Sequence, residues 1–214
     1  MRQPTPPVLL PLVLAAGLTY GSSTAFCQTP MQMSAYGDDG CRRAAGTLQL
    51  VAGNSVARFL PAESCLELRG HRVKIEFLGT RGVRPRLMAE NNASPVASAL
   101  PRRVVYAGMW PGIRVVFALD PDGGAEIAWL LAKGAEVSHI RVRYSVPVEI
   151  RDDGTLRFLF PTGPVTESSP EAWQAIDGKR VAVGAAFAAL ADGAIGFRVG
   201  SYDPRYPLTI DPAW

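Results

Sequence analysis

The sequence predicts an all-β domain built as an antiparallel β-sandwich with many short strands and Asp-Gly hairpins. Three observations support this prediction. Apolar and charged residues alternate in short runs, turn signals separate these runs at intervals of about 8 to 12 residues, and no window outside the N-terminus carries the apolar stripe of a helix. This combination is typical of sandwiches and barrels.

The alternation is clearest in two segments. In Arg72–Phe77 the residues Val73, Ile75 and Phe77 alternate with charged ones, and residues 140–144 repeat the pattern with two arginines. A side-chain period of two places the apolar residues on one face and the charges on the other. Both segments are therefore predicted to be half-buried antiparallel strands.

Further strands are expected at short intervals, with Asp-Gly turns between several of them. One helical turn is expected near Glu136–His139. The expected strands are 113–118, 125–131, 148–151, 155–160, 179–183, 187–190, 194–199 and 208–210, and the turn signals lie at 120–124, 152–154, 177–178 and 192–193.

Length and composition indicate one exported domain. The chain has 214 residues, of which 48% are hydrophobic and 19% charged, so it can bury a core of ordinary size. We expect a signal peptide at 1–25, a flexible linker at 26–46 and a β-sandwich domain at 47–214. Prolines and asparagines in 79–103 suggest a connection that could separate two sheet layers.

The N-terminus has the pattern of an export signal. Arg2 supplies the positive charge, residues 8–18 form a short apolar run, and Ser23 and Ala25 provide small residues for cleavage. The run is shorter than the roughly 20 residues of a membrane span, and no later window is long enough. The sequence therefore predicts a secreted, periplasmic or cell-surface protein without a transmembrane segment after cleavage.

An exported chain can form disulfides, and this one contains three cysteines, Cys27, Cys41 and Cys65. Their odd number leaves either one pair with a free thiol or no pair. We expect Cys41 and Cys65 to pair, because Cys27 lies in a segment with few packing residues. A bond closing a loop of that length contributes roughly 3 kcal/mol.

The charge pattern and the polar residues exclude several function classes. The net charge is +3, but the arginines are scattered among acidic residues, so no basic stripe for nucleic acid is visible. The only histidines, His71 and His139, have no ligand spacing around them, and the Asp-Gly segments are explained as turns. We therefore expect no metal, no cofactor and no catalytic residues; carboxylates for sugar chemistry cannot be placed together from sequence.

The aromatic residues suggest a ligand site. Trp129 and Tyr144 occupy the apolar phase of their strands and are expected in the core. Trp110 and Trp173 lie beside prolines in turn-like segments, so we expect them at the surface, where a ring face can stack on a sugar. They are the candidate ligand-stacking residues.

Several short motifs follow one another in the C-terminal half. They are Val105-Tyr106, Trp110-Pro111-Gly112-Ile113, Lys133-Gly134-Ala135, Asp153-Gly154, Trp173-Gln174, Asp177-Gly178-Lys179, Tyr202-Asp203-Pro204 and Leu208-Thr209-Ile210-Asp211-Pro212. In this order, residues 104–212 resemble the uncharacterised β-rich domain of secreted bacterial proteins that commonly precedes SBBP-type beta-propeller repeats. No catalytic residue is established for that family, so the resemblance assigns none to this chain.

Physically, these motifs are turn and strand devices. Pro fixes one backbone angle, Gly frees the next, and a Pro at the end of a strand lacks a donor that is not needed. We therefore assign structural roles to Pro111, Gly112, Asp177, Gly178, Tyr202, Asp203, Asp211 and Pro212.

Together these observations predict a non-catalytic structural or interaction module of a bacterial envelope or extracellular protein. Its partner would be a protein or a glycan at the cell surface. The alternative is a carbohydrate-binding or carbohydrate-processing sandwich, which depends on the two tryptophans.

Overall fold

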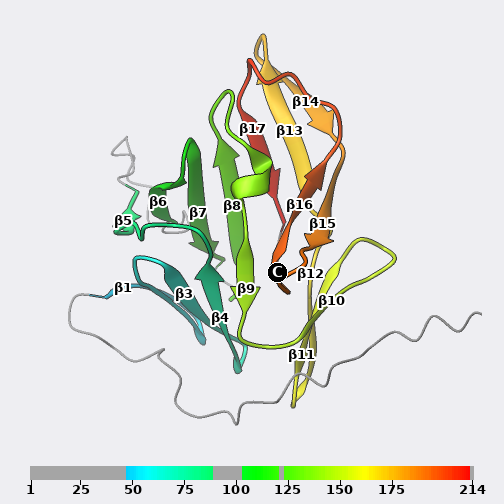
Figure 1. Cartoon of the computed structure of the whole chain (residues 1–214). Helices are drawn as coiled ribbons and strands as arrows, with labels where there is room; N and C mark the ends of the chain where they lie inside the picture. Colours follow the sequence, from blue (N-terminus) through cyan, green and yellow to red (C-terminus); the bar gives the residue numbers. More distant parts are fainter. Residues whose placement is uncertain (1–46, 89–102, 121–122, 213–214) are drawn as a thin grey trace, which may run out of the picture. The chain divides into compact units, whose positions relative to one another are not determined.

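A computed structural model of the chain describes residues 47–88, 103–120 and 123–212. All of them belong to one compact unit, Asp38–Trp214. The predicted all-β sandwich is confirmed, since two seven-stranded antiparallel sheets share one hydrophobic core, and a three-stranded sheet adjoins them (Figure 1). The expected helical turn is also present, as the 3-10 turn η2 at Val137–His139.

The first sheet combines strands from both halves of the chain. Its order is β1-β2-β3-β4-β9-β16-β15. The bounds are β1 Leu48–Ala52, β2 Ser55–Phe59, β3 Glu63–Leu68, β4 His71–Phe77, β9 Val142–Tyr144, β15 Ala185–Ala189 and β16 Ile195–Val199. Residues 79–103 therefore do not divide the chain into one sheet before and one sheet after them.

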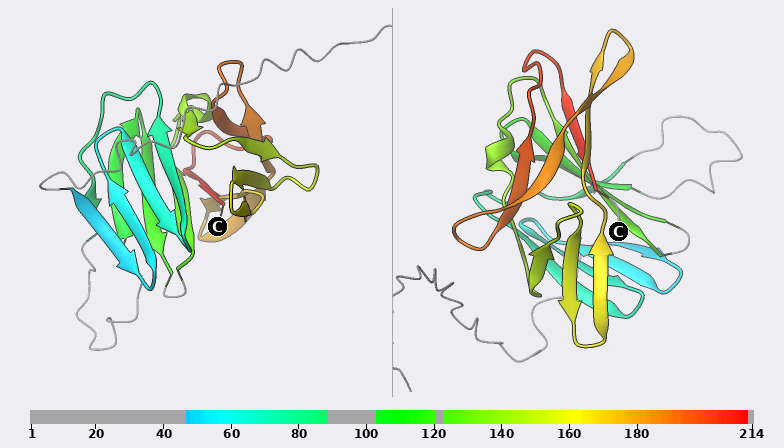
Figure 2. Two further views of the ribbon diagram at one scale, coloured as in Figure 1. Left: turned by 90° about the horizontal axis from the view of Figure 1, so that it is seen from below. Right: turned by 90° about the vertical axis from the view of Figure 1, so that its right-hand side faces the viewer.

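The second sheet packs against the first and has the order β14-β13-β17-β8-β7-β6-β5. Figure 2 shows the cyan strands of the first sheet lying over the green strands of the second. The bounds are β5 Arg86–Leu87, β6 Arg103–Trp110, β7 Ile113–Leu119, β8 Ala125–Leu131, β13 Glu171–Ile176, β14 Lys179–Val183 and β17 Leu208–Asp211.

A smaller third sheet consists of β10 Val148–Ile150, β11 Leu156–Phe160 and β12 Gly163–Glu167. It is attached through side chains. Phe158 meets the Tyr144 ring edge-on at 4.9 Å, and Phe160 packs against His71 at 4.7 Å between ring centroids. The His71 Nδ1 also lies 3.1 Å from the Thr162 hydroxyl oxygen. These contacts fix the β11–β12 hairpin to the start of β4.

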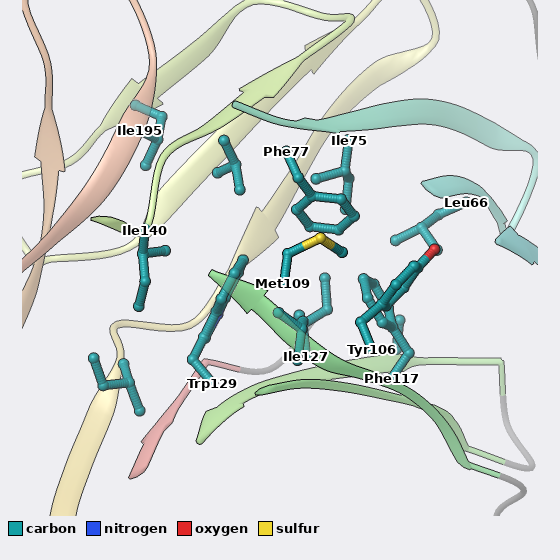
Figure 3. Close-up of a cluster of buried hydrophobic side chains, with 14 of the residues drawn as sticks. Leu66, Ile75, Phe77, Tyr106, Met109, Phe117, Ile127, Trp129, Ile140 and Ile195 are labelled. Atoms are coloured by element: carbon teal, nitrogen blue, oxygen red, sulfur yellow. The ribbon is translucent and has the colours of Figure 1, made fainter. Parts of the chain in front are cut away.

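The core lies between the two large sheets and is rich in aromatic rings. Phe59 of β2 meets Phe117 of β7 at 5.1 Å between ring centroids, and Phe77 of β4 lies near Tyr106, Trp110 and Trp129 of the second sheet. Figure 3 shows the side chains converging from both layers. Edge-to-face ring contacts of this kind add to the hydrophobic stabilisation of the burial itself.

Two of the turns at these motifs have backbone angles that favour glycine. Asp177 and Gly178 both have positive φ (50° and 75°) and join the paired residues Ile176 and Lys179, as a tight hairpin of right-handed twist requires. Gly112 has φ of 71°, and a Cβ there would lie 2.9 Å from the Ala135 Cβ. This position therefore needs glycine for two independent reasons.

Strands β12 and β13 were not predicted, because polar side chains point inward in both of them. β13 buries Gln174 and turns Trp173 outward, which inverts the expected apolar phase. β12 contains Gly163 and Pro164 and buries Glu167, so its pattern resembles a loop. The 140–144 strand is also shorter than expected, because Ile140 closes the 3-10 turn before β9 begins.

Candidate functional site

The expectation that Trp110 lies at the surface is wrong. Its side chain is only 3% exposed, its ring packs against those of Phe77 and Trp129, and its Nε1 donates a hydrogen bond of 2.8 Å to the Leu78 carbonyl oxygen. The cause is a bulge in β6. Residues 107–109 stand opposite Arg114 alone, between the pairs Tyr106–Val115 and Trp110–Ile113, and this shift turns the ring into the core.

Trp173 has a different environment. It is half-buried on the outer face of the second sheet, the face that points away from the first sheet. The Arg180 guanidinium of the neighbouring strand lies 3.6 Å from the centre of its ring and donates a 3.0 Å hydrogen bond to Glu171 Oε2. One face of the Trp173 ring is thus occupied by a cation, and the structure does not bring Trp110 and Trp173 together.

A carboxylate lies beside this aromatic residue. Asp211 stands directly opposite Glu171 on the adjacent strand, and its Oδ1 is buried without a hydrogen-bond partner among the described residues. Burial and, to a smaller extent, the nearby Glu126 carboxylate raise the pKa of Asp211 to about 6, against the opposing effect of Arg180. The sequence analysis assigned Asp211 a structural role and did not predict that a second carboxylate would stand opposite it.

The loop after β16 is fixed by one buried side chain. The Gln174 amide donates to the carbonyl oxygens of Asp203 and Tyr206, at 2.7 and 3.2 Å, and accepts from the Asp203 backbone N–H at 2.9 Å. The Asp203 carboxylate in turn accepts from Arg205, which lowers the pKa of Asp203 to about 2. Asp203 is thus part of a structural loop, beside the half-buried Tyr202 ring that packs on the core.

A shallow groove crosses the outer face of the second sheet next to the β6 bulge. Its volume is about 440 Å³. Most of the residues that line it are small or apolar. They belong to the bulge, to β8 and the turn that follows it, and to the loop between β16 and β17. The residues that shape it include Ala107, Gly108, Arg114, Leu130, Ala132 and Pro207.

Arg114 is the one charged residue in that lining. It is exposed on β7, and within the described part of the chain it has no ion pair, hydrogen bond or ring contact. By contrast, several charges on the outer face of the first sheet are paired, such as Lys74 with Glu63 and Arg143 with Glu76. The sequence predicted the strand on which Arg114 lies. It did not predict the groove, because the groove depends on the bulge and no local sequence pattern indicates a bulge there.

A second cavity, of about 340 Å³, lies where the three sheets meet. His71, Arg69 and Thr166 contribute to its lining together with the backbone of the β7–β8 turn. Its histidine already contacts Thr162 and Phe160, so it holds the third sheet in place.

Neither a metal cluster nor a membrane-spanning helix is found in the described ranges. Residues 47–88, 103–120 and 123–212 contain no group of three or more His, Cys, Asp or Glu side chains that could hold a metal ion. The same ranges contain no helix long and apolar enough to cross a membrane.

Cys65 is disulfide-bonded. Its side chain lies on the outer face of the first sheet, opposite Arg58 and Lys74, and is 1% exposed. Cys41 and Cys27 lie outside the described residues. The pairing of Cys65 with Cys41 stays a prediction.

The fold and these sites define a class of protein: an antiparallel two-sheet domain whose buried polar groups join its parts and whose outer face carries a groove. Residues 50–213 match the family described as "Domain of unknown function (DUF7948)", and the chain belongs to that family. The resemblance to an uncharacterised domain is therefore confirmed at this level. No curated protein matches the chain, and no solved structure matches it.

Proposed function

We propose that this domain is a non-catalytic interaction module of a bacterial protein exported to the envelope or the medium. The observation that carries the proposal is the use of the buried polar side chains. Tyr106, Trp110 and Gln174 each bond to backbone carbonyl oxygens of another segment, so these side chains hold the fold together. What the domain then offers to other molecules is its surface.

Export is supported by two independent features. The first 25 residues have the composition of a signal peptide, and Cys65 is disulfide-bonded, which is typical of proteins outside the cytoplasm. The resemblance of residues 104–212 to the domain that commonly precedes SBBP repeats further supports a place within a larger surface protein.

The export proposal is tested by expressing the full chain and a variant that lacks residues 1–25 in a Gram-negative host. We expect the full chain in the periplasm or medium, shortened at its N-terminus and with Cys65 oxidised, and the truncated chain in the cytoplasm. A full chain that stays intact in the cytoplasm would refute export. Release of product from any polysaccharide by the purified protein would refute the non-catalytic role.

A second candidate function is glycan binding at Trp173. It is supported by the position of this ring on an outer sheet face, with the polar side chains of Thr209, Arg180 and Glu171 around it. Rings flanked by polar groups are typical of sugar sites. A glycan array read together with tryptophan fluorescence tests it.

The matched control for that experiment is Arg198→Gln, a change at an exposed residue of the first sheet. Saturable glycan binding that is lost in Trp173→Ala and kept in the control supports the sugar site. A blank array removes this candidate and leaves the interaction module, whose own test is separate.

A further inference from the structure

The groove beside the β6 bulge is formed by backbone geometry. Between Tyr106 and Trp110 the strand contains three residues where its partner β7 has one, Arg114. Gly108 in the middle of this bulge has φ of 81°, and no atom lies within 4 Å of where its Cβ would be. The position that a side chain of residue 108 would occupy is therefore open. Bulges are often found where a sheet must present a side chain to a ligand.

Arg114 is the side chain presented here. It projects from the outer face of β7 between the bulge and Leu130, its cross-strand neighbour on β8. Its guanidinium has five donors in a planar fork, and no acceptor among the described residues uses them. Since the surrounding groove is apolar, a carboxylate is the group that best complements this cation.

The lining favours a peptide over a sugar. A sugar site needs a ring face to cover the apolar side of the pyranose, and the groove is lined by Ala, Gly, Leu, Ile, Pro and one Arg. Among the described residues, the outward tryptophan is Trp173, which lies three strands away from Arg114, roughly 14 Å at ordinary strand spacing. Small apolar walls instead suit the alternating side chains of an extended peptide.

We propose that this groove binds an extended peptide of alternating apolar residues through an Asp or Glu carboxylate that pairs with Arg114. This inference rests on the proposed interaction role and names the partner and the surface. It requires an acidic peptide chain, because neither a neutral peptide nor an aromatic-dependent glycan would use the unpaired guanidinium.

The test is selection from a displayed library of random dodecapeptides against the purified mature chain. We expect enriched peptides that combine one Asp or Glu with flanking apolar residues. Their affinity is measured by isothermal titration for the parent chain, for Arg114→Gln and for Arg198→Gln. The control removes the same charge from an exposed arginine on the other sheet that has no partner among the described residues.

We expect Arg114→Gln, and equally an acid-to-amide change in the peptide, to weaken binding at least about tenfold, while Arg198→Gln leaves it unchanged. The two changes combined should cost no more than either alone, as expected for groups that contact each other. Placing a side chain in the groove with Gly108→Asn, a residue that tolerates positive φ, should also abolish binding without unfolding the chain.

Peptides that bind equally well to Arg114→Gln would overturn the groove assignment while leaving the interaction module intact. A selection that enriches nothing would also overturn it. Neither outcome bears on export or on the absence of turnover, which have their own experiment, so the two proposals can fail separately.

Discussion

The hydroxyl oxygen of Tyr106 lies 3.0 Å from that of Ser64, and both side chains are fully buried between the two large sheets. The same phenol oxygen donates to the Leu60 carbonyl oxygen at 2.8 Å and lies 3.2 Å from that of Glu63. Burial raises the pKa of Tyr106 well above its usual value, so the phenol is neutral and can donate. One side chain of β6 therefore fastens the second sheet to the β2–β3 turn of the first.

Removing this hydroxyl should destabilise the domain. In Tyr106→Phe the ring remains, but the Ser64 hydroxyl and the Leu60 carbonyl lose a buried partner, at a cost of about 1–3 kcal/mol in unfolding free energy. Urea unfolding followed by tryptophan fluorescence measures the change. Tyr202→Phe is the control, since no described residue forms a hydrogen bond with the hydroxyl of this half-buried side chain and the change should stay within about 0.5 kcal/mol. Equal stabilities for all three chains would disprove the role of Tyr106.

The turn at Gly112 allows backbone strain to be separated from a clash. Gly112→Ala introduces both backbone strain and a clash, since φ is 71° and the new Cβ would lie 2.9 Å from that of Ala135. Gly178→Ala meets only the strain, at φ of 75° with nothing within 4 Å. We expect a loss of about 1 kcal/mol for Gly178→Ala and clearly more for Gly112→Ala, measured by urea unfolding.

A second change identifies the clash. Ala135→Gly in the Gly112→Ala background removes the atom that the new Cβ meets, so part of the lost stability should return. If the double variant is simply the sum of both single losses, the contact with Ala135 plays no part.

Asp211 should make stability depend on pH in an uncommon direction for an acid. Its pKa in the folded chain is about 6, above the usual value of 3.8, so folding favours the protonated acid. The stabilisation is therefore complete below the unfolded pKa and is lost as the pH rises through about 6. The facing charges are Glu126 and Glu171, which raise the pKa, and Arg180 and Arg103, which lower it.

Asp211→Asn removes the titration. We expect the variant to be more stable than the parent by about 1 kcal/mol near pH 8, after allowance for solvent screening, and nearly equal to it near pH 4. Urea unfolding at both pH values measures the difference. Glu171→Gln should shift the parent's transition to lower pH, because it removes the charge opposite Asp211. A parent chain whose stability rises from pH 4 to 8 relative to Asp211→Asn would contradict the argument.

Sequence pattern predicted β4, β7 and β8 close to their observed bounds. Alternate residues are buried along β4 and β8, whereas β7 buries nearly all of its residues. The Asp177–Gly178 hairpin follows from two residues that accept positive φ. The prediction of an exposed Trp110 was wrong, because a bulge changes which face of the strand each residue occupies and no local sequence pattern indicates the bulge. Local sequence pattern also could not predict that β9 pairs with β4 and with β16. Pairing between strands that are distant in the chain depends on the packing of the whole core.

The candidate site was less accessible from sequence for a related reason. Trp173 is half-buried on an outer sheet face, and its partner Arg180 lies on the neighbouring strand and reaches the ring only through the register of the hairpin. Arg114 is one scattered arginine among many until the bulge opens a groove around it.

The disulfide of Cys65 gives the last prediction. Cys65 is bonded, and the chain contains two other cysteines, Cys27 and Cys41, so replacing each in turn identifies the partner. We expect Cys41→Ser to free the Cys65 thiol, detected by alkylation and peptide mapping under denaturing conditions, and to lower the unfolding free energy by roughly 3 kcal/mol, as loss of a loop-closing bond implies. Cys27→Ser should leave Cys65 oxidised and the stability unchanged. The reverse pattern would assign the bond to Cys27. Because Cys65 projects from the outer face of the first sheet and is not part of the core cluster, near-ultraviolet circular dichroism of the core aromatics should survive the loss of the bond in either case.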